Sequence, residues 1–254
     1  MSKKRKWIFR VGAGVVVVLA VGFVALAFSL GAIVKKGVEK IGPNATQVDV
    51  KLKGAEVWLF GGSVQLTGLV VGNPPGCKTP FAMSVDEVSV RVKPGSVFSD
   101  KLVVESIKVK APVITFEGGL SANNLKRIEK NLNDYIGSSS TAPNSSASSS
   151  IPGKPERKLQ VNELVITGVK LQVNTKLSAG RTITLSIPDI HLTDLGTGAE
   201  GITGVEVGQR ALHAVLDAAT TEVARNAGEL GKEGLDRAKS AVQSAADRLK
   251  GLFH

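Results

Sequence analysis

An eight-residue pattern of apolar side chains recurs along the chain and constrains its fold more than any other feature. Apolar residues fill its first, third, sixth and eighth positions, and copies begin at Val64, Met83, Leu102, Leu159 and Leu185. These offsets scatter around a helix, which excludes an amphipathic helix. On a straight strand, the two-residue gap would turn the second half to the opposite face. A β-bulge or sharp twist at the gap returns all four side chains to one face, so the pattern predicts strands of about 26 Å with one apolar side.

The spacing of the copies argues against chance in a Val-rich chain. The first three copies start 19 residues apart, the fourth starts 57 residues later, and the fifth follows after 26 more. The step of 57 equals three steps of 19 and includes a linker, and a weaker copy begins earlier, at Val50. Repeated strands of this kind predict a curved antiparallel sheet with an apolar concave face.

The segment from Val11 to Val34 contains 24 residues without a charged side chain. As a helix it would extend about 36 Å, enough to cross a hydrocarbon core of about 30 Å. Five basic residues precede it, which favours a cytoplasmic N-terminus at 1–10 and places the rest of the chain on the other side. A cleaved signal peptide with its site near Ala25–Ala27 and a buried helix of a soluble protein are the alternatives.

The charge of the chain is concentrated beside this segment. Of the net charge of +10, residues 1–40 carry eight basic side chains and one acidic one, leaving 24 basic against 21 acidic residues elsewhere. The basic excess therefore flanks a membrane segment, and we expect no nucleic-acid partner. The single cysteine, Cys77, excludes a disulfide within the chain.

The order of motifs in residues 5–135 resembles that of AsmA-like envelope proteins. The segment from Val64 to Gly76 resembles the family's first strand and its turn, in which Asn73, Pro74 and Gly76 match the turn motif. A Val-rich strand, a strand pair containing Pro112 and a short Asn124–Ile128 helix follow in the family's order, with a weaker echo at 157–195. The resemblance implies an inner-membrane anchor, a twisted sheet with a lipid-compatible groove and a role in envelope lipid homeostasis.

The chain departs from this family in three ways. Cys77 stands where an aromatic residue is usual, the chain is far shorter than typical members, and it ends in helix rather than in further strands. Five or six strands would cover only part of a periplasm, which puts long-range lipid bridging in doubt.

The remaining segments complete the predicted domain organisation. The β region occupies 45–136, with a short helix near 122–136, and continues over 157–200 after a Ser- and Pro-rich linker at 137–156. Residues 205–254 are Ala-rich and predict amphipathic helices with a Gly hinge near 228–234. These helices could pack over the sheet as a lid, bind a partner helix or lie on a membrane surface. The candidates for partner binding are Leu235, Val242, Leu249 and Leu252.

The sequence contains none of the motifs that carry common enzymatic chemistry. A nucleophile elbow, a P-loop, a dinucleotide fingerprint and a zinc-protease helix are all absent. His191, His213 and the carboxylates Glu163, Asp189 and Asp194 have no matching partners in the sequence, so we interpret them as surface or packing residues. We expect a protein that is not an enzyme and binds neither a metal nor a cofactor.

Together these features predict a membrane-anchored, mainly β protein of a bacterial inner membrane, with its bulk in the periplasm. It would be non-catalytic and would hold or guide phospholipid acyl chains in an apolar β groove, contributing to envelope lipid homeostasis or outer-membrane biogenesis. The alternatives are a tethered scaffold whose C-terminal helices bind a partner protein and a cleaved, soluble periplasmic protein. The predicted groove residues are Val64, Leu66, Leu69, Val71, Val88, Val90, Leu102, Val104, Ile107, Val109, Leu164 and Ile166.

Overall fold

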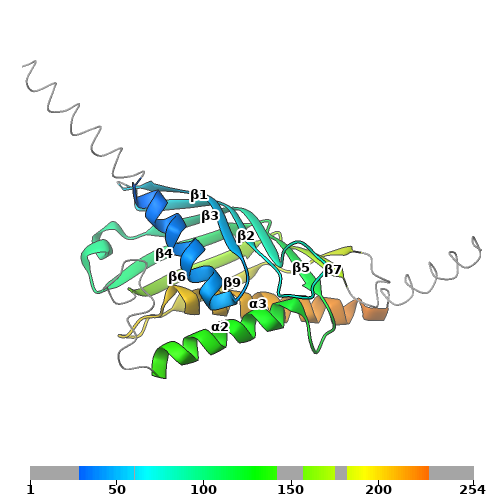
Figure 1. The fold of residues 1–254 in the computed structure, drawn as a ribbon. Coiled ribbons are helices and arrows are strands. Elements are labelled where there is room, and N and C mark those ends of the chain that lie inside the picture. The colour runs from blue at the N-terminus through cyan, green and yellow to red at the C-terminus, as the bar shows by residue number, and fades with distance from the viewer. Residues whose placement is uncertain (1–28, 60, 142–156, 175–181, 229–254) are drawn as a thin grey trace, which may run out of the picture.

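A computed structural model describes residues 29–59, 61–141, 157–174 and 182–228. In these ranges the chain forms one mixed sheet with helices along one side (Figure 1). The fold is therefore mixed α/β rather than mainly β. Residues 29–46 are helical. The other helices are the 3-10 helix η1 (Pro94–Phe98), α2 (Asn124–Thr141) and α3 (Gly204–Arg225).

Nine β segments of the described chain make up the sheet. They are β1 (Val50–Trp58), β2 (Ser63–Val71), β3 (Met83–Val92), β4 (Lys101–Lys110), β5 (Val113–Glu117), β6 (Lys158–Thr167), β7 (Lys170–Asn174), β8 (Ile183–Ser186) and β9 (Ile190–Leu195). The order β8-β7-β5-β3-β4-β6-β9 is joined at β3 by the hairpin of β1 and β2.

Some pairs of these segments are the two halves of a single long strand that is interrupted in the middle. Val88 of β3 faces Val109 of β4, and four residues along each chain Ser84 faces Val113 of β5, so the register continues unshifted through the break. Ala111, with φ of 46°, and Pro112 form that break. β6 and β7 are interrupted in the same way at Gly168, with φ of 64°. In the described residues the sheet thus has six long strands, and three of them are broken, at Ala111–Pro112, at Gly168 and between β8 and β9.

The predicted all-antiparallel arrangement is wrong at the centre of the sheet. β4 pairs with β6 in parallel, and β5 pairs with β7 in parallel. In both pairs each residue faces the one 57 positions later, as in Leu102 with Leu159 and Ile114 with Leu171. A parallel pair needs a long crossover, which the chain supplies through α2 and the segment after it. The 57-residue step therefore connects parallel neighbours and is not three hairpin steps.

In the first and third copies of the apolar pattern, the gap coincides with a local irregularity of the strand. Gly68 has φ of 61° within the gap of the first copy. In β4 the pairing with β3 shifts by one residue, leaving Glu105 unpaired within the gap of the third copy. The fifth copy, from Leu185 to Leu192, is not one continuous strand, because Pro188 lies at the break between β8 and β9.

The helix at 29–46 covers β1, which is an edge strand of the sheet. Leu52 donates its N–H to the Glu39 carboxylate at 3.1 Å, and Lys35 donates to the Lys53 carbonyl at 3.2 Å. A Cβ on Gly31 would lie 2.2 Å from the carbonyl oxygen of Ala55, so only glycine permits this approach. The helix thus satisfies polar groups of a strand edge that would otherwise be open to pairing.

Short polar side chains set where α2 and α3 begin. The Asn123 carboxamide oxygen accepts from the Lys126 N–H at 2.9 Å, as an N-cap residue does. Thr203 and Glu206 form a reciprocal capping box at the start of α3. α2 extends to Thr141, into residues predicted as linker, and within it the Ser138 hydroxyl donates back to the Asp134 carbonyl at 2.7 Å.

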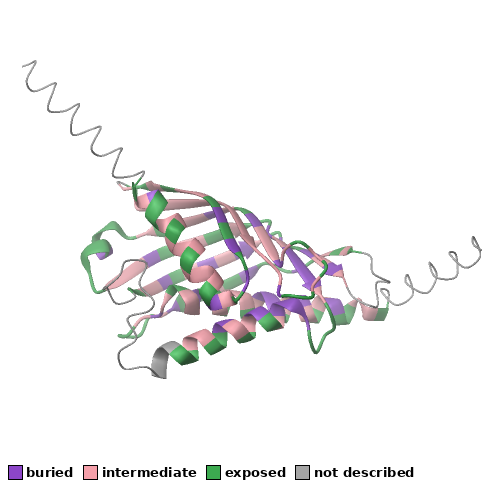
Figure 2. Ribbon diagram, viewed as in Figure 1, coloured by how far each residue is buried: buried purple, intermediate pink, exposed green. Residues whose placement is uncertain are grey.

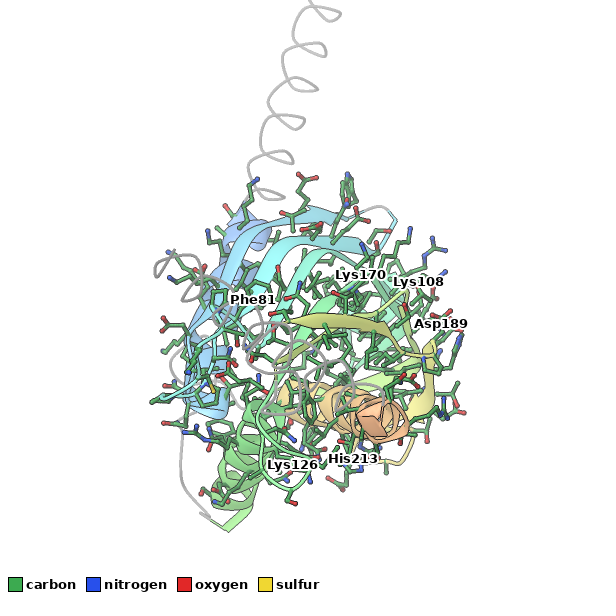
Figure 3. All side chains as sticks on the ribbon, turned by 90° about the vertical axis from the view of Figure 1, so that its right-hand side faces the viewer. Phe81, Lys108, Lys126, Lys170, Asp189 and His213 are labelled. Carbon is green, nitrogen blue, oxygen red and sulfur yellow. The ribbon has the colours of Figure 1, made fainter. Side chains whose placement is uncertain are left out.

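The core lies between the sheet and the helices. Its most buried side chains are apolar residues of β5, β6, β7 and α3, among them Phe116, Val161, Leu171 and Ala219. Figure 2 shows buried positions along the strands and on the face of α3 that meets the sheet. Viewed end-on, the sheet arches over the helices, with Lys126 and His213 on the helical side, across the molecule from Lys108 (Figure 3).

Several predicted segments fall partly or wholly outside the described residues. Among the described residues, no helix is long and apolar enough to cross a membrane, and residues 11–28 of the predicted span are not among them. The predicted cytoplasmic flank, linker residues 142–156 and the Gly hinge beyond Gly228 also lie outside them. The same holds for the partner-helix candidates Leu235, Val242, Leu249 and Leu252.

Candidate functional site

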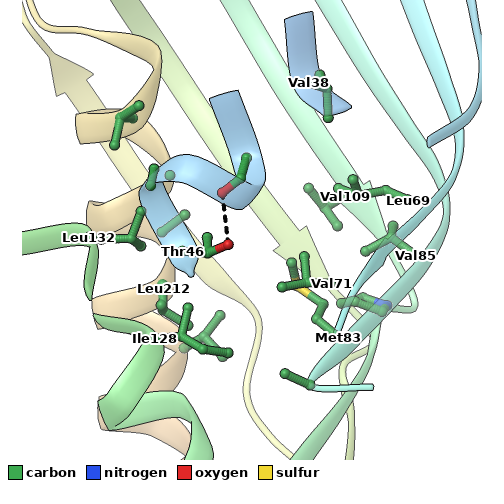
Figure 4. Close-up of a pocket in the computed structure, with 18 of the residues that line it drawn as sticks. Val38, Thr46, Leu69, Val71, Met83, Val85, Val109, Ile128, Leu132 and Leu212 are labelled. Atoms are coloured by element: carbon green, nitrogen blue, oxygen red, sulfur yellow. Dashed lines mark hydrogen bonds between the residues drawn. The ribbon is translucent and has the colours of Figure 1, made fainter. Parts of the chain in front are cut away.

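A cavity of about 480 Å³ lies between the sheet and its three covering helices (Figure 4). One wall is the sheet, and the others are the 29–46 helix, α2 and α3. Its volume falls in the range of small-molecule sites, about 300–1,000 Å³. The cavity is partly open to solvent.

Five of the twelve predicted groove residues line this cavity. They are Leu69, Val71, Val88, Val109 and Ile166. Val88 faces Val109 across one strand pair, and Val109 faces Ile166 across the next, so the three side chains form a row on one face. The repeated pattern therefore places apolar side chains from separate strands on a common surface.

The other seven predicted residues do not line the cavity. Val104 and Leu164 are buried in the core, and Val90 and Ile107 are partly buried against it, because α3 packs over β6 and β9. Val64, Leu66 and Leu102 are half-buried outside the cavity. Helices fill much of the concave face, so only part of the predicted apolar groove borders the cavity.

The wall formed by the 29–46 helix was not predicted from the sequence, whereas packing of the C-terminal helices over the sheet was one of the alternatives. Helix 29–46 contributes Gly37, Val38, Ile41, Gly42 and Ala45, which recur at helical spacing just after the uncharged segment. That spacing was the available signal. α3 contributes a second wall of small and apolar residues, which are Gly204, Val205, Gly208, Ala211, Leu212 and Val215.

Among the described residues that line the cavity, Thr46 supplies the one polar side chain. Its hydroxyl donates to the Gly42 carbonyl at 2.7 Å and also lies 3.3 Å from the Val48 carbonyl oxygen. The hydroxyl is already satisfied within its own segment, so nothing in the lining favours a polar ligand group. The described cavity fits a hydrocarbon chain, with any charged group left at the opening.

The predicted turn motif has a structural role. The Asn73 amide donates to the Thr79 hydroxyl at 2.7 Å, and its oxygen accepts from Asn124 at 2.8 Å. Asn124, at the start of α2, is only 1% exposed and also donates to the Thr115 carbonyl at 2.8 Å. These bonds join the β2–β3 connection, β5 and α2, which are walls or supports of the cavity.

Glu117 fixes the other side of the same turn. Its carboxylate accepts the N–H groups of Lys78 at 2.6 Å and Thr79 at 2.9 Å, together with the Thr79 hydroxyl. Partial burial by itself would raise the pKa of this carboxyl, but these hydrogen bonds outweigh burial and hold the pKa below its ordinary value. Burial, followed by the nearby Glu117 charge, raises the pKa of the Cys77 thiol despite Arg127. The thiol is thereby kept in its less reactive, protonated form.

His213 connects α2 and α3, two of the helices that line the cavity. Its Nδ1 lies 2.6 Å from Glu129 Oε1 on α2, and its Nε2 lies 3.4 Å from Asp217. The hydrogen bond to Glu129 is the main cause that raises the pKa of His213, with the charge of Asp217 adding to it and partial burial opposing it. The contact therefore strengthens when the imidazole is protonated.

We expect His213→Gln to lower stability more in mild acid than in mild alkali. A raised pKa in the folded state gives stability that is complete below the ordinary value of about 6.5 and is lost as pH rises through the folded value. The side chain is 58% exposed, so the effect should stay within about 0.2–1 kcal/mol. Thermal unfolding at about pH 5.5 and 8.5, with His191→Gln on β9 as control, measures it. An equal loss at both pH values would contradict the prediction.

Asp189, another of the candidate polar residues, has a structural role. The Asp189 carboxylate accepts the Gly168 N–H at 3.0 Å. This bond connects the break between β8 and β9 to the break between β6 and β7. Within the ranges that the structure describes, no three His, Cys, Asp or Glu side chains lie where they could hold a metal ion.

Comparison with known proteins adds no assignment to this geometry. No protein-family model, curated protein or solved structure matches the chain.

Proposed function

We propose that this protein is a non-catalytic, membrane-anchored protein that holds a lipid acyl chain in the cavity between its sheet and its helices. The observation that carries the proposal is a half-open cavity of about 480 Å³ whose lining has one polar side chain, already hydrogen-bonded. On this proposal the chain is a short AsmA-like envelope protein of a bacterial inner membrane, with its sheet in the periplasm.

The energetics of such a ligand follow from the lining. Each methylene group taken from water gains about 0.8 kcal/mol, so a long acyl chain recovers enough to offset its ordering. Exact shape is less important for such a chain than continuous apolar cover, which Leu69, Val71 and Met83 supply from the sheet and Leu212 from α3 (Figure 4).

The 29–46 helix gives the proposal its connection to a membrane. Six residues between Gly37 and Thr46 line the cavity, and the helix begins within the uncharged segment that runs from Val11 to Val34. A lipid leaving the bilayer beside that segment would thus meet the cavity wall on the same stretch of chain.

Adding bulk to the cavity lining tests the proposal. Gly208 lines the cavity on α3, and a Cβ built there meets no atom within 4 Å, so Gly208→Phe starts from open space and also removes a glycine from a helix. We expect the full-length wild-type protein, purified and washed in mild detergent, to retain phospholipid that mass spectrometry detects. Gly208→Phe should lose most of it while unfolding at the same or a higher temperature.

Gly137→Phe is the matched control. Gly137 lies on α2, has equally open space at its Cβ and does not line the cavity. This variant should retain as much lipid as the wild type, including any lipid held around the uncharged segment. Equal retention by all three proteins, or no retained lipid at all, would sink the proposal.

A further inference from the structure

Exposed large apolar side chains gather at one end of the sheet. Among the described residues, five such side chains are exposed: Ile33, Trp58, Val97, Phe98 and Leu120. The first four lie near the end where β1 finishes and β4 begins, and Leu120 lies at the opposite end, after β5. Phe98 is 95% exposed, an unusual state for a phenylalanine in a folded domain.

The segments that carry these side chains are packed together. The Val92 N–H donates to the Gly62 carbonyl at 2.7 Å, and a Cβ on Gly62 would meet Val92 and Pro94. This contact places the turn between β1 and β2, which follows Trp58, beside η1. Arg157 then donates to the carbonyls of Val97 and Ser99, which fastens η1 to the start of β6. We call this group of segments the η1 end.

The η1 end is also where the chain arrives from its uncharged segment. Gly31 packs against Ala55 of β1, three residues before Trp58, so the first described turns of the 29–46 helix lie at this end (Figure 1). Ile33 on that helix is 46% exposed. In the sequence, residues 11–28 directly precede this point and carry no charge.

Basic and acidic side chains both surround η1. Lys93 and Lys101 flank it and Arg157 is bonded to it, while Asp100 lies beside it and Asp194 and Glu200 lie in or near the loop that Lys101 contacts. Because the charge around η1 is mixed, the feature that suits a bilayer is the group of exposed apolar side chains, and aromatic rings such as that of Trp58 are enriched at membrane interfaces.

We infer that the η1 end is a second membrane-contact surface, which inserts Phe98, Val97 and Trp58 into the bilayer interface beside the uncharged segment. It holds the sheet in a fixed orientation over the lipid. The inference rests on the proposed membrane anchor but not on a ligand in the cavity, so the quenching result can fail while lipid retention succeeds, or the reverse.

Contact quenching of tryptophan fluorescence tests this surface. The chain has two tryptophans, so Trp7→Phe leaves Trp58 as the only one. The full-length variant is reconstituted into phosphatidylcholine–phosphatidylglycerol vesicles with or without brominated acyl chains, which quench only at contact. We expect brominated lipid to quench Trp58 strongly and iodide in solution to quench it weakly.

The matched control moves the indole to the other end of the sheet. In Trp7→Phe/Trp58→Phe/Leu120→Trp the only tryptophan replaces an exposed leucine after β5, and iodide alone should quench it. Equal behaviour of the two proteins would overturn the inference. So would a Trp58 that is shielded from iodide yet unaffected by brominated lipid, which would mean that protein covers it, or a chain that does not float with the vesicles.

Discussion

Asn124→Leu is expected to destabilise the protein by about 3 kcal/mol, which corresponds to a fall in Tm of roughly 6–12 °C. Leucine has a similar size, so the change removes hydrogen bonds with little change in volume. Asn124 is 1% exposed, and the Asn73 oxygen, the Thr115 carbonyl and the Glu117 N–H each lose a partner. A buried polar group left without a partner costs about 1–3 kcal/mol.

The destabilisation caused by Asn124→Leu should also be concentrated near the substituted residue. Asn124 joins the turn after β2 to the first turn of α2, and α2 supplies Leu125, Ile128 and Leu132 to the cavity wall. Hydrogen exchange should therefore rise first in residues 73–79 and in α2. Asn162→Leu, at an exposed position of β6, is the control and should change stability by no more than about 0.5 kcal/mol. A similar small change for Asn124→Leu would show that the buried network contributes little.

Local patterning was sufficient to predict which side chains share a face. The pattern at Val64, Val90 and Ile107 was read strand by strand, and the register places these residues opposite one another. This succeeds because alternation along a strand depends only on neighbouring residues.

The pairing partners of the strands were not predictable in the same way. The interval of 57 residues separates β4 from β6 and also β5 from β7, and it brings Ala111 and Gly168, both with positive φ, to equivalent breaks. The 57-residue interval is visible in the sequence. Strands joined by hairpins and strands joined by crossovers, however, have the same apolar pattern. Only the tertiary position of α2 distinguishes them.

Local sequence patterns also could not predict which part of the concave face the helices fill. Val104 and Leu164 have the same local signal as Val109 and Ile166, yet the first pair is buried in the core and the second lines the cavity. The difference arises from where α3 crosses β6 and β9, which depends on long-range packing. A sequence stripe therefore predicts an apolar face, and the covering helices decide which part of it stays open.

The contact between the cavity and a lipid can be measured at two neighbouring positions of α3. Leu212 lines the cavity, and His213, the next residue, is 58% exposed on the outside of the helix. A benzophenone amino acid is introduced at either position in the full-length protein, membranes are irradiated, and adducts are identified by mass spectrometry.

The account predicts a phospholipid or fatty-acyl adduct at position 212 and little or none at position 213. The two sites share the same helix and the same distance from any membrane, so a difference between them reports on the cavity itself. Adducts of equal yield at both positions, or an adduct at 212 only to residues of the protein, would contradict the claim that the cavity holds an acyl chain.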